Sequence, residues 1–186
     1  MSATSEPTPK SADTTALQII LAVSLGHLLN DLMQSLIPAA YPLVKHNLGL
    51  SFSQVGLITL VFQGTASVLQ PLIGRYTDRH PLPYAMAAGM ACSGSGLVFL
   101  AHAQSFAVVL LSVALIGLGS SIFHPEASRV ARLAAGMRPG FAQSLFQVGG
   151  NFGSALGPLA AAFVLLERGQ IAIGWFAVTA LIGMLL

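Results

Sequence analysis

Formal charges are absent from four long stretches of the sequence. The longest covers the 46 residues 80–125, and the others cover 47–74, 139–166 and 169–186. A bilayer's hydrocarbon core needs about 20 apolar residues per helix, so the longest stretch has to cross twice, with a turn near 102–105. The pattern therefore predicts a polytopic, all-α membrane protein.

Six transmembrane helices are predicted, at about 17–44, 52–74, 83–101, 106–129, 140–166 and 171–186. Residues 1–15 mix prolines and charges with Ser and Thr, which predicts a disordered cytoplasmic tail ahead of a bundle over 16–186. The last apolar stretch spans 16 residues and has no polar flank, which is short for a crossing. We therefore expect the chain to be truncated inside its sixth helix.

Composition agrees with a membrane protein, because 54% of residues are hydrophobic and only 8% are charged. Soluble domains carry about 25% charged residues. The basic residues lie scattered at segment ends, so nucleic acid is not an expected partner. Cys92 is the single cysteine, which excludes an intrachain disulfide and a cysteine zinc cluster. We expect neither a metal nor a cofactor.

The basic residues predict an orientation. If the amino terminus is cytoplasmic, the cytoplasmic ends carry Lys10, Arg75, Arg79, Arg129, Arg132 and Arg138. Lys45 and Arg168 then lie on the other side. The positive-inside rule favours this arrangement.

A weak internal repeat relates the second and fifth predicted helices. FSQ at 52–54, FQ at 62–63 and SVLQPL at 67–72 resemble FAQ at 141–143, FQ at 146–147 and SALGPL at 154–159. With three helices per copy, the second copy is upside down relative to the first. This indicates two inverted three-helix repeats, as in many secondary transporters.

Polar residues on one face of the first helix are the first candidate site. His27, Asn30, Asp31 and Gln34 follow the i, i+3, i+4, i+7 spacing of a single helix face. A carboxylate at membrane depth is costly, so Asp31 should face protein or water. Asp31 and His27 are proton-coupling candidates, and a packing hydrogen bond with His27 or Asn30 is the structural alternative.

The fourth helix gathers polar groups around Pro125, which cannot donate a backbone hydrogen bond and kinks a helix. His124 exchanges protons near neutral pH and is a further proton-coupling candidate. Glu126 is another, but it also stands three residues before Arg129, a spacing at which the two form an ion pair.

Amides on several helices predict a shared, water-accessible cavity. Its substrate-binding candidates are Asn30, Gln34, Gln63, Gln147 and Asn151. Amides at such depths bind polar solutes or join helices, and both alternatives remain for each residue. Gly149, Gly153 and Gly157 repeat every four residues ahead of Pro158, which predicts close helix packing.

Two motifs resemble the major facilitator superfamily. GRYTDR at 74–79 is similar to the superfamily's loop motif, without its usual basic residues afterwards. The resemblance implies that Gly74, Asp78 and Arg79 control gating. The segment from Gly153 to Pro158 resembles the fifth-helix motif of proton-coupled antiporters, although alanines replace later glycines.

A closer resemblance is to the fosmidomycin resistance family of bacterial exporters. It is carried by GHLLNDLMQSLIP at 26–38, FHPEASR at 123–129 and AQSLFQVGGN at 142–151. It implies that this chain is the amino-terminal half of a twelve-helix inner-membrane protein. It also implies proton-coupled antiport of a small drug such as fosmidomycin.

The residues also allow other functions. Another small polar solute or metabolite is an alternative substrate for the transporter. Ser93-Gly94-Ser95-Gly96 is superficially close to the motif of rhomboid-like intramembrane proteases, but Ser93 replaces the first glycine and no suitable histidine follows. A six-helix self-assembling channel is a third possibility. No ATP-binding loop is found, so the energy is expected to come from an ion gradient or from the solute itself. We expect a transporter and not an enzyme.

Overall fold

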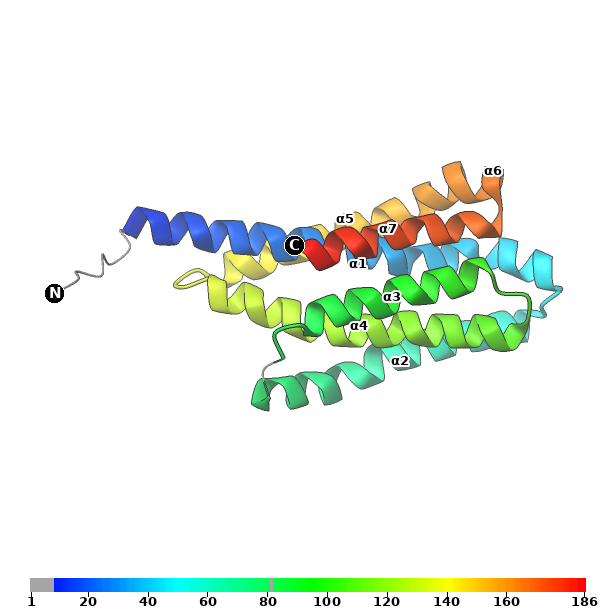
Figure 1. Ribbon diagram of the computed structural model, residues 1–186, viewed down its shortest axis with the longest axis horizontal. Coiled ribbons are helices and arrows are strands. Elements are labelled where there is room, and N and C mark those ends of the chain that lie inside the picture. The colour runs from blue at the N-terminus through cyan, green and yellow to red at the C-terminus, as the bar shows by residue number, and fades with distance from the viewer. Residues whose placement is uncertain (1–8, 81) are drawn as a thin grey trace.

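The apolar stretches form helices in the computed structural model, which describes residues 9–80 and 82–186 (Figure 1). The elements are α1 (Pro9–Leu48), α2 (Phe52–Arg79), α3 (Ala85–Ala101), α4 (Phe106–Ala134), α5 (Pro139–Ala160), the π-helical η1 (Ala161–Leu165), α6 (Leu166–Arg168), the 3-10 helix η2 (Gln170–Phe176) and α7 (Ala177–Leu185). No strand occurs among the described residues. The predicted all-α class is confirmed.

Four helical segments are long and apolar enough to cross a membrane: Thr14–Leu48, Phe52–Arg79, Phe106–Ala134 and Pro139–Arg168. Two shorter apolar segments, Ala85–Ala101 and Gln170–Leu185, run beside them (Figure 1). Together they give the six helical segments that the sequence predicts. The fifth includes η1 and α6 after α5, and the sixth is η2 followed by α7.

Several helices extend beyond the stretches that the sequence marks as apolar. α1 begins at Pro9, so 9–15 are helical where a disordered tail was expected. Residues 1–8 and the side chain of Lys10 lie outside the described part of the chain. α2 continues to Arg79, which places the GRYTDR motif in its last turns and not in a loop. At the end of α2 the helix continues past the apolar stretch, and the charged side chains of Asp78 and Arg79 are exposed there.

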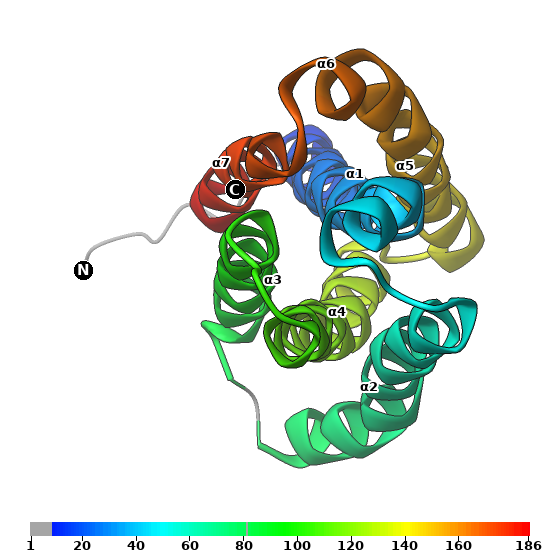
Figure 2. The same ribbon diagram turned by 90° about the vertical axis from the view of Figure 1, so that its right-hand side faces the viewer.

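α1 and α4 form the centre of the bundle (Figure 2). α5 packs on α1 and α2 packs on α4, while α3 contacts α4 and α7. If the first, second and third helices are exchanged with the fourth, fifth and sixth, the α1–α5 contact becomes the α4–α2 contact. The same pairs of helices are therefore obtained. That arrangement is the one expected of two related three-helix repeats.

Glycines bring α1 and α5 close together. A Cβ atom at Gly149 would collide with the main-chain oxygen of Ser24, and one at Gly153 would collide with that of Leu28. Gly157 lies equally close to the side chain of Ser35. The predicted packing series thus lies in the α1–α5 contact, and Pro158 follows it one turn before η1.

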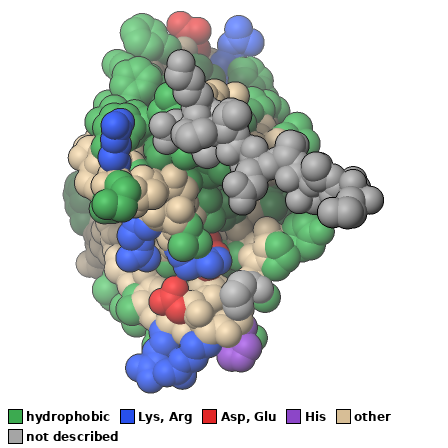
Figure 3. All heavy atoms as spheres, turned by 90° about the vertical axis from the view of Figure 1, so that its left-hand side faces the viewer, with side chains coloured by type: hydrophobic (Ala, Val, Ile, Leu, Met, Phe, Trp, Pro, Cys, Tyr) green, Lys and Arg blue, Asp and Glu red, His purple; other side chains and the backbone are tan. Residues whose placement is uncertain are grey.

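Basic side chains gather at one end of the bundle (Figure 3). This end contains the carboxyl ends of α2 and α4 and the start of α5 (Figure 1). Its basic residues are Arg75, Arg79, Arg129, Arg132 and Arg138. Lys45 and Arg168 lie in the last turns of α1 and α6, at the other end of the bundle.

Candidate functional site

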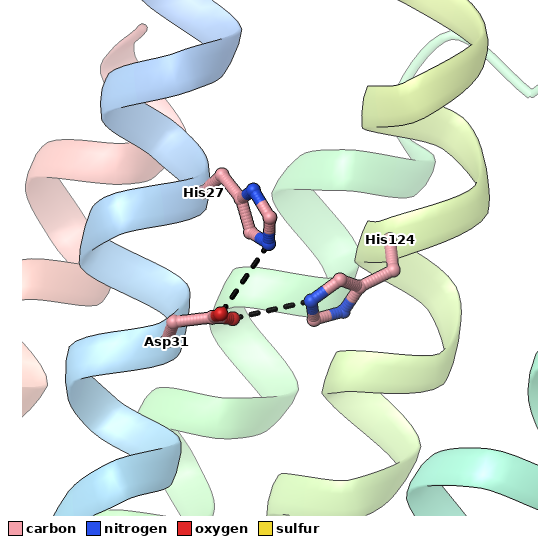
Figure 4. A group of neighbouring side chains, drawn as sticks. All are labelled: His27, Asp31 and His124. Carbon is pink, nitrogen blue, oxygen red and sulfur yellow. Dashed lines mark hydrogen bonds and ion pairs between the residues drawn. The ribbon is translucent and has the colours of Figure 1, made fainter. Parts of the chain in front are cut away.

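Three titratable side chains meet between α1 and α4 (Figure 4). Asp31 lies one turn after His27 on α1, and His27 Nε2 is 3.3 Å from Asp31 Oδ2. On α4, His124 Nε2 is 3.1 Å from Asp31 Oδ1. The sequence placed His27 and Asp31 on one helix face, and the fold adds His124 across a separation of 93 positions.

Both imidazoles are fixed at their other nitrogen. His27 Nδ1 lies 2.8 Å from the main-chain oxygen of Phe146 on α5. The His27 ring also stacks on the Phe146 ring, with centroids 4.0 Å apart. His124 Nδ1 lies 2.9 Å from the main-chain oxygen of Ser120, one turn earlier on α4. The two rings therefore present Nε2 to Asp31.

Neutral groups complete the surroundings of Asp31. Gln34 donates from Nε2 to Asp31 Oδ1 at 3.1 Å, and Asn30 donates to the same oxygen at 3.4 Å. Ser154 on α5 donates to Oδ2 at 3.5 Å. Three helices thus converge on one carboxylate, which buries most of it without enclosing it.

The cluster opens on one side only. The His27 side chain is 4% exposed, whereas those of Asp31 and His124 are 18% and 22% exposed. Asp31 and His124 line a cavity of about 290 Å³ between α1, α2, α4 and α5. The other lining residues are Gln34, Ser35, Pro38, Phe62, Gln63, Ala66, Ser67, Gln70, Ser120 and Ser154. Water or a small polar solute in this cavity therefore reaches Asp31 and His124, while His27 lies behind them.

A second hollow of about 690 Å³ continues toward the basic end and shares Gln70 and His124 with the first. Its lining includes the motif residues Gly74, Asp78 and Arg79. Gly74 lies against Pro125, since a Cβ atom there would be 3.2 Å from Pro125 Cβ. The predicted gating motif and His124 thus border the same hollow, which adjoins the cavity at Asp31.

Glu126 does not join the cluster. Its Oε2 accepts a hydrogen bond from Arg129 Nη2 at 2.5 Å, and its side chain is only 3% exposed. Its other oxygen, Oε1, has no hydrogen-bond partner among the described residues. Of the two alternatives for Glu126, the structure shows the ion pair, formed within α4 by a buried carboxylate and an Arg129 side chain that is 24% exposed.

The substrate-binding candidates divide into three groups. Gln34 and Gln63 line the smaller cavity. Asn30 is fully buried behind Asp31, so it supports the carboxylate and does not contact the cavity. Gln147 and Asn151 are exposed on α5 and line neither hollow, so the prediction of one shared lining fails for them.

Sequence reasoning did not single out Phe146 or Gly150. Phe146 contributes its carbonyl oxygen, which is invisible in a side-chain pattern. Gly150 provides room for the His27 ring, because a Cβ atom there would collide with it. The available signal was that Gly150 shares one face of the fifth predicted helix with Gln147 and Asn151.

The cluster also has the donor types of a transition-metal site, because ligand atoms of His27, Asp31 and His124 lie within 4.8 Å of one another. However, each imidazole already faces a carboxylate oxygen at hydrogen-bond distance, so protons alone satisfy all three groups. The absence of a metal stays a prediction.

Comparisons with known proteins agree with this geometry. The family model for the Major Facilitator Superfamily matches residues 23–186. The fosmidomycin resistance protein of Escherichia coli (strain K12) is 55% identical over 90% of this chain and 41% of its own length. The uncharacterized MFS-type transporter YfnC of Bacillus subtilis (strain 168) is 45% identical over 94% of this chain and 43% of its own length.

More distant similarity extends to the uncharacterized MFS-type transporter YwoD of Bacillus subtilis (strain 168), which is 26% identical over 83% of this chain. The chain spans about two fifths of the length of the first two relatives. YfnC and YwoD are named as transporters, and the long apolar helices of this chain are those of a multi-pass membrane protein. The chain therefore belongs to the Major Facilitator Superfamily.

Proposed function

We propose that the protein is a proton-coupled antiporter that exports a small drug such as fosmidomycin across the bacterial inner membrane. The observation that carries the proposal is the contact of Asp31 with His27 and His124 beside a polar cavity. The relative named for fosmidomycin resistance supports the substrate. Imidazoles exchange protons near neutral pH and need no cofactor to do so, and Asp31 contacts both of them.

Proton exchange at Asp31 changes the charge beside the cavity. When the cluster binds or releases protons, the relative energies of the inward-open and outward-open states change. Gln34 on α1 and Gln63 on α2 hold a polar solute from opposite walls. Solute and protons then occupy the cavity alternately, which is the requirement for exchange.

A second six-helix half completes this transporter in our proposal. The chain covers about two fifths of its first relatives, and transporters of this plan rock two halves about a central site. Asp78 and Arg79 are exposed beside the larger hollow, and neither makes an ion pair with another described residue. They are therefore available to latch that second half and to control gating.

The orientation follows from the basic end. Five arginines lie at the end that contains the carboxyl termini of α2 and α4. Under the positive-inside rule this end is cytoplasmic, and so is the amino terminus. The larger hollow then opens toward the cytoplasm, where a drug to be exported enters.

The test uses drug-susceptible bacteria that express the full-length parent protein. We expect the wild type to raise fosmidomycin resistance, and Asp31→Asn or a protonophore to return resistance to the vector level. Glu167→Gln is the matched control, because Glu167 is an exposed carboxylate on α6, away from the cluster. Membrane levels of each variant are measured by immunoblot. Unchanged resistance in correctly inserted Asp31→Asn contradicts the proposal.

Transport of another small polar solute is the second candidate. Asp31 and His124 are the only titratable residues that line the smaller cavity, and its other polar groups are amides and hydroxyls. This lining suits a neutral polar molecule as well as an anion. A wild type that confers no fosmidomycin resistance, but whose Asp31-dependent proton flux responds to another solute, favours this candidate.

A further inference from the structure

The hydrogen bonds at Nδ1 determine where the cluster carries its protons. A main-chain oxygen only accepts hydrogen bonds, so His27 Nδ1 donates to the oxygen of Phe146 and His124 Nδ1 donates to that of Ser120, 2.9 Å away. The Ser120 hydroxyl lies farther from His124 Nδ1, at 3.2 Å, and accepts from the same N–H. In a neutral imidazole the other nitrogen, Nε2, then carries a lone pair and no hydrogen. Both Nε2 atoms nevertheless lie within 3.3 Å of Asp31 oxygens.

Two lone pairs facing each other at this distance repel. An ionised carboxylate has no hydrogen to offer, so each Nε2···O contact requires an additional proton between the two atoms. The geometry contains two such contacts, one to each oxygen of Asp31. We propose that His27, Asp31 and His124 form a site that holds two exchangeable protons at once, and that Gly150 positions His27 for the second of them.

The charge of the cluster follows from this count. Without the two protons, Asp31 and two neutral imidazoles carry one negative charge, and with both protons they carry one positive charge. No other charge opposes this change within the smaller cavity. α2 contributes the neutral Gln63 and Gln70 and α5 contributes Ser154. α3 and α7 contain no Asp, Glu, Lys or Arg at all.

The charged groups farther along the helices do not line the smaller cavity. Glu126 on α4 is neutralised by Arg129. Arg75, Asp78 and Arg79 on α2 line the larger hollow and not the smaller one. The field at the smaller cavity therefore reverses sign between the two-proton and proton-free states.

Gly150 is what allows His27 to take part. A Cβ atom at this position would lie 2.5 Å from His27 Nε2 and 2.8 Å from Nδ1, so alanine displaces the ring from both partners. Gly150 carries no titratable group, and substituting it changes the position of the imidazole without changing its chemistry. Gly64 on α2 is a matched control, because nothing lies within 4 Å of a Cβ atom there.

The test is ¹⁵N NMR of the full-length protein labelled at histidine, recorded between about pH 5 and 8. Loss of one signal in His27→Gln and of another in His124→Gln assigns the two rings. We expect both to be imidazolium at acidic pH, and both to carry hydrogen only at Nδ1 once neutral. Gly150→Ala should alter the His27 signal and leave that of His124, and Gly64→Ala should leave both.

Two results overturn the inference. One is an Nε2–H tautomer for either neutral ring, and the other is a cluster in which only one ring becomes imidazolium. The wild-type tautomers decide the matter even if Gly150→Ala does not fold. The inference rests on the proposed function only in treating the cluster as a proton-exchange site. A wrong tautomer leaves antiport through Asp31 possible, while Asp31-independent export leaves the proton count intact.

Discussion

The contact between α1 and α5 and the contact between α2 and α4 use polar groups in opposite ways. Between α1 and α5, Ser24 donates to the carbonyl oxygen of Leu145 at 2.6 Å, and His27 donates to that of Phe146. On α2, the amides of Gln63 and Gln70 line the cavity and make no hydrogen bond to any described residue. At the α1–α5 contact these polar side chains are therefore hydrogen-bonded to protein. The amides of Gln63 and Gln70 remain available to a solute.

Close approach of the helix backbones differs in extent. Gly149 and Gly153 of α5 lie against the α1 main chain, whereas α4 lies against the α2 main chain at Gly117. α2 buries four side chains and α5 buries two, while α4, which both contacts share, buries ten side chains and two glycines. The cluster of His27, Asp31 and His124 thus lies beside the contact with more glycines, and α2 presents its amides from the opposite wall. Preorganised groups on rigid elements hold their geometry best.

Gly153→Leu should have the largest effect, because it breaks the tight side of this comparison. Its Cβ would collide with the main-chain oxygen of Leu28, which cannot move without shifting α1. We expect a loss of more than about 3 kcal/mol in the free energy of unfolding. Unfolding of the purified full-length protein by SDS titration measures it.

Gly64→Leu is the corresponding change on α2. Nothing lies within 4 Å of a Cβ atom at Gly64, so we expect a change of less than about 0.5 kcal/mol there. If the two variants prove equally stable, the α1–α5 contact is not the rigid side of the bundle.

Arg129→Gln tests the helix that both sides share. It leaves the Glu126 carboxylate, which is 3% exposed, without its ion-pair partner. Removing one member of a buried pair costs about 3 kcal/mol or slightly more, whereas replacing both members costs much less. Thermal unfolding of Arg129→Gln and of the double variant Glu126→Gln/Arg129→Gln should separate the two effects. Equal destabilisation of single and double variants would show that Glu126 needs no counter-charge.

The tight side was partly readable from the sequence. Charge-free stretches gave the helices, and the spacing of His27 and Asp31 put both on one face of α1. The glycine series also predicted a close approach. The residue that contacts Asp31 from α4, His124, could not be predicted as its partner. The rotation of one helix against another depends on packing that a side-chain pattern does not encode.

His124 and Glu126 show this limit. They stand two positions apart on α4, and both were candidates for proton exchange, with an ion pair to Arg129 as the alternative for Glu126. That spacing turns them about 200° around a helix, so only one can face Asp31. The structure selects His124 and turns Glu126 to Arg129. Similarly, Gln147 and Asn151 share a polar stripe with Ser154, but only Ser154 reaches the cavity.

Gln63→Ala should have the smallest effect and sharpens the comparison on the adaptable side. Because the Gln63 amide bonds to no described residue, its removal leaves no protein group unpaired, and stability should not change. A solute held by this amide loses one hydrogen bond worth about 1 kcal/mol, or about fivefold in apparent affinity. Gln104→Ala, in the exposed loop between α3 and α4, is the control. Transport kinetics in proteoliposomes of the full-length protein measure the shift, and a loss of stability in place of affinity would place Gln63 among the packing residues after all.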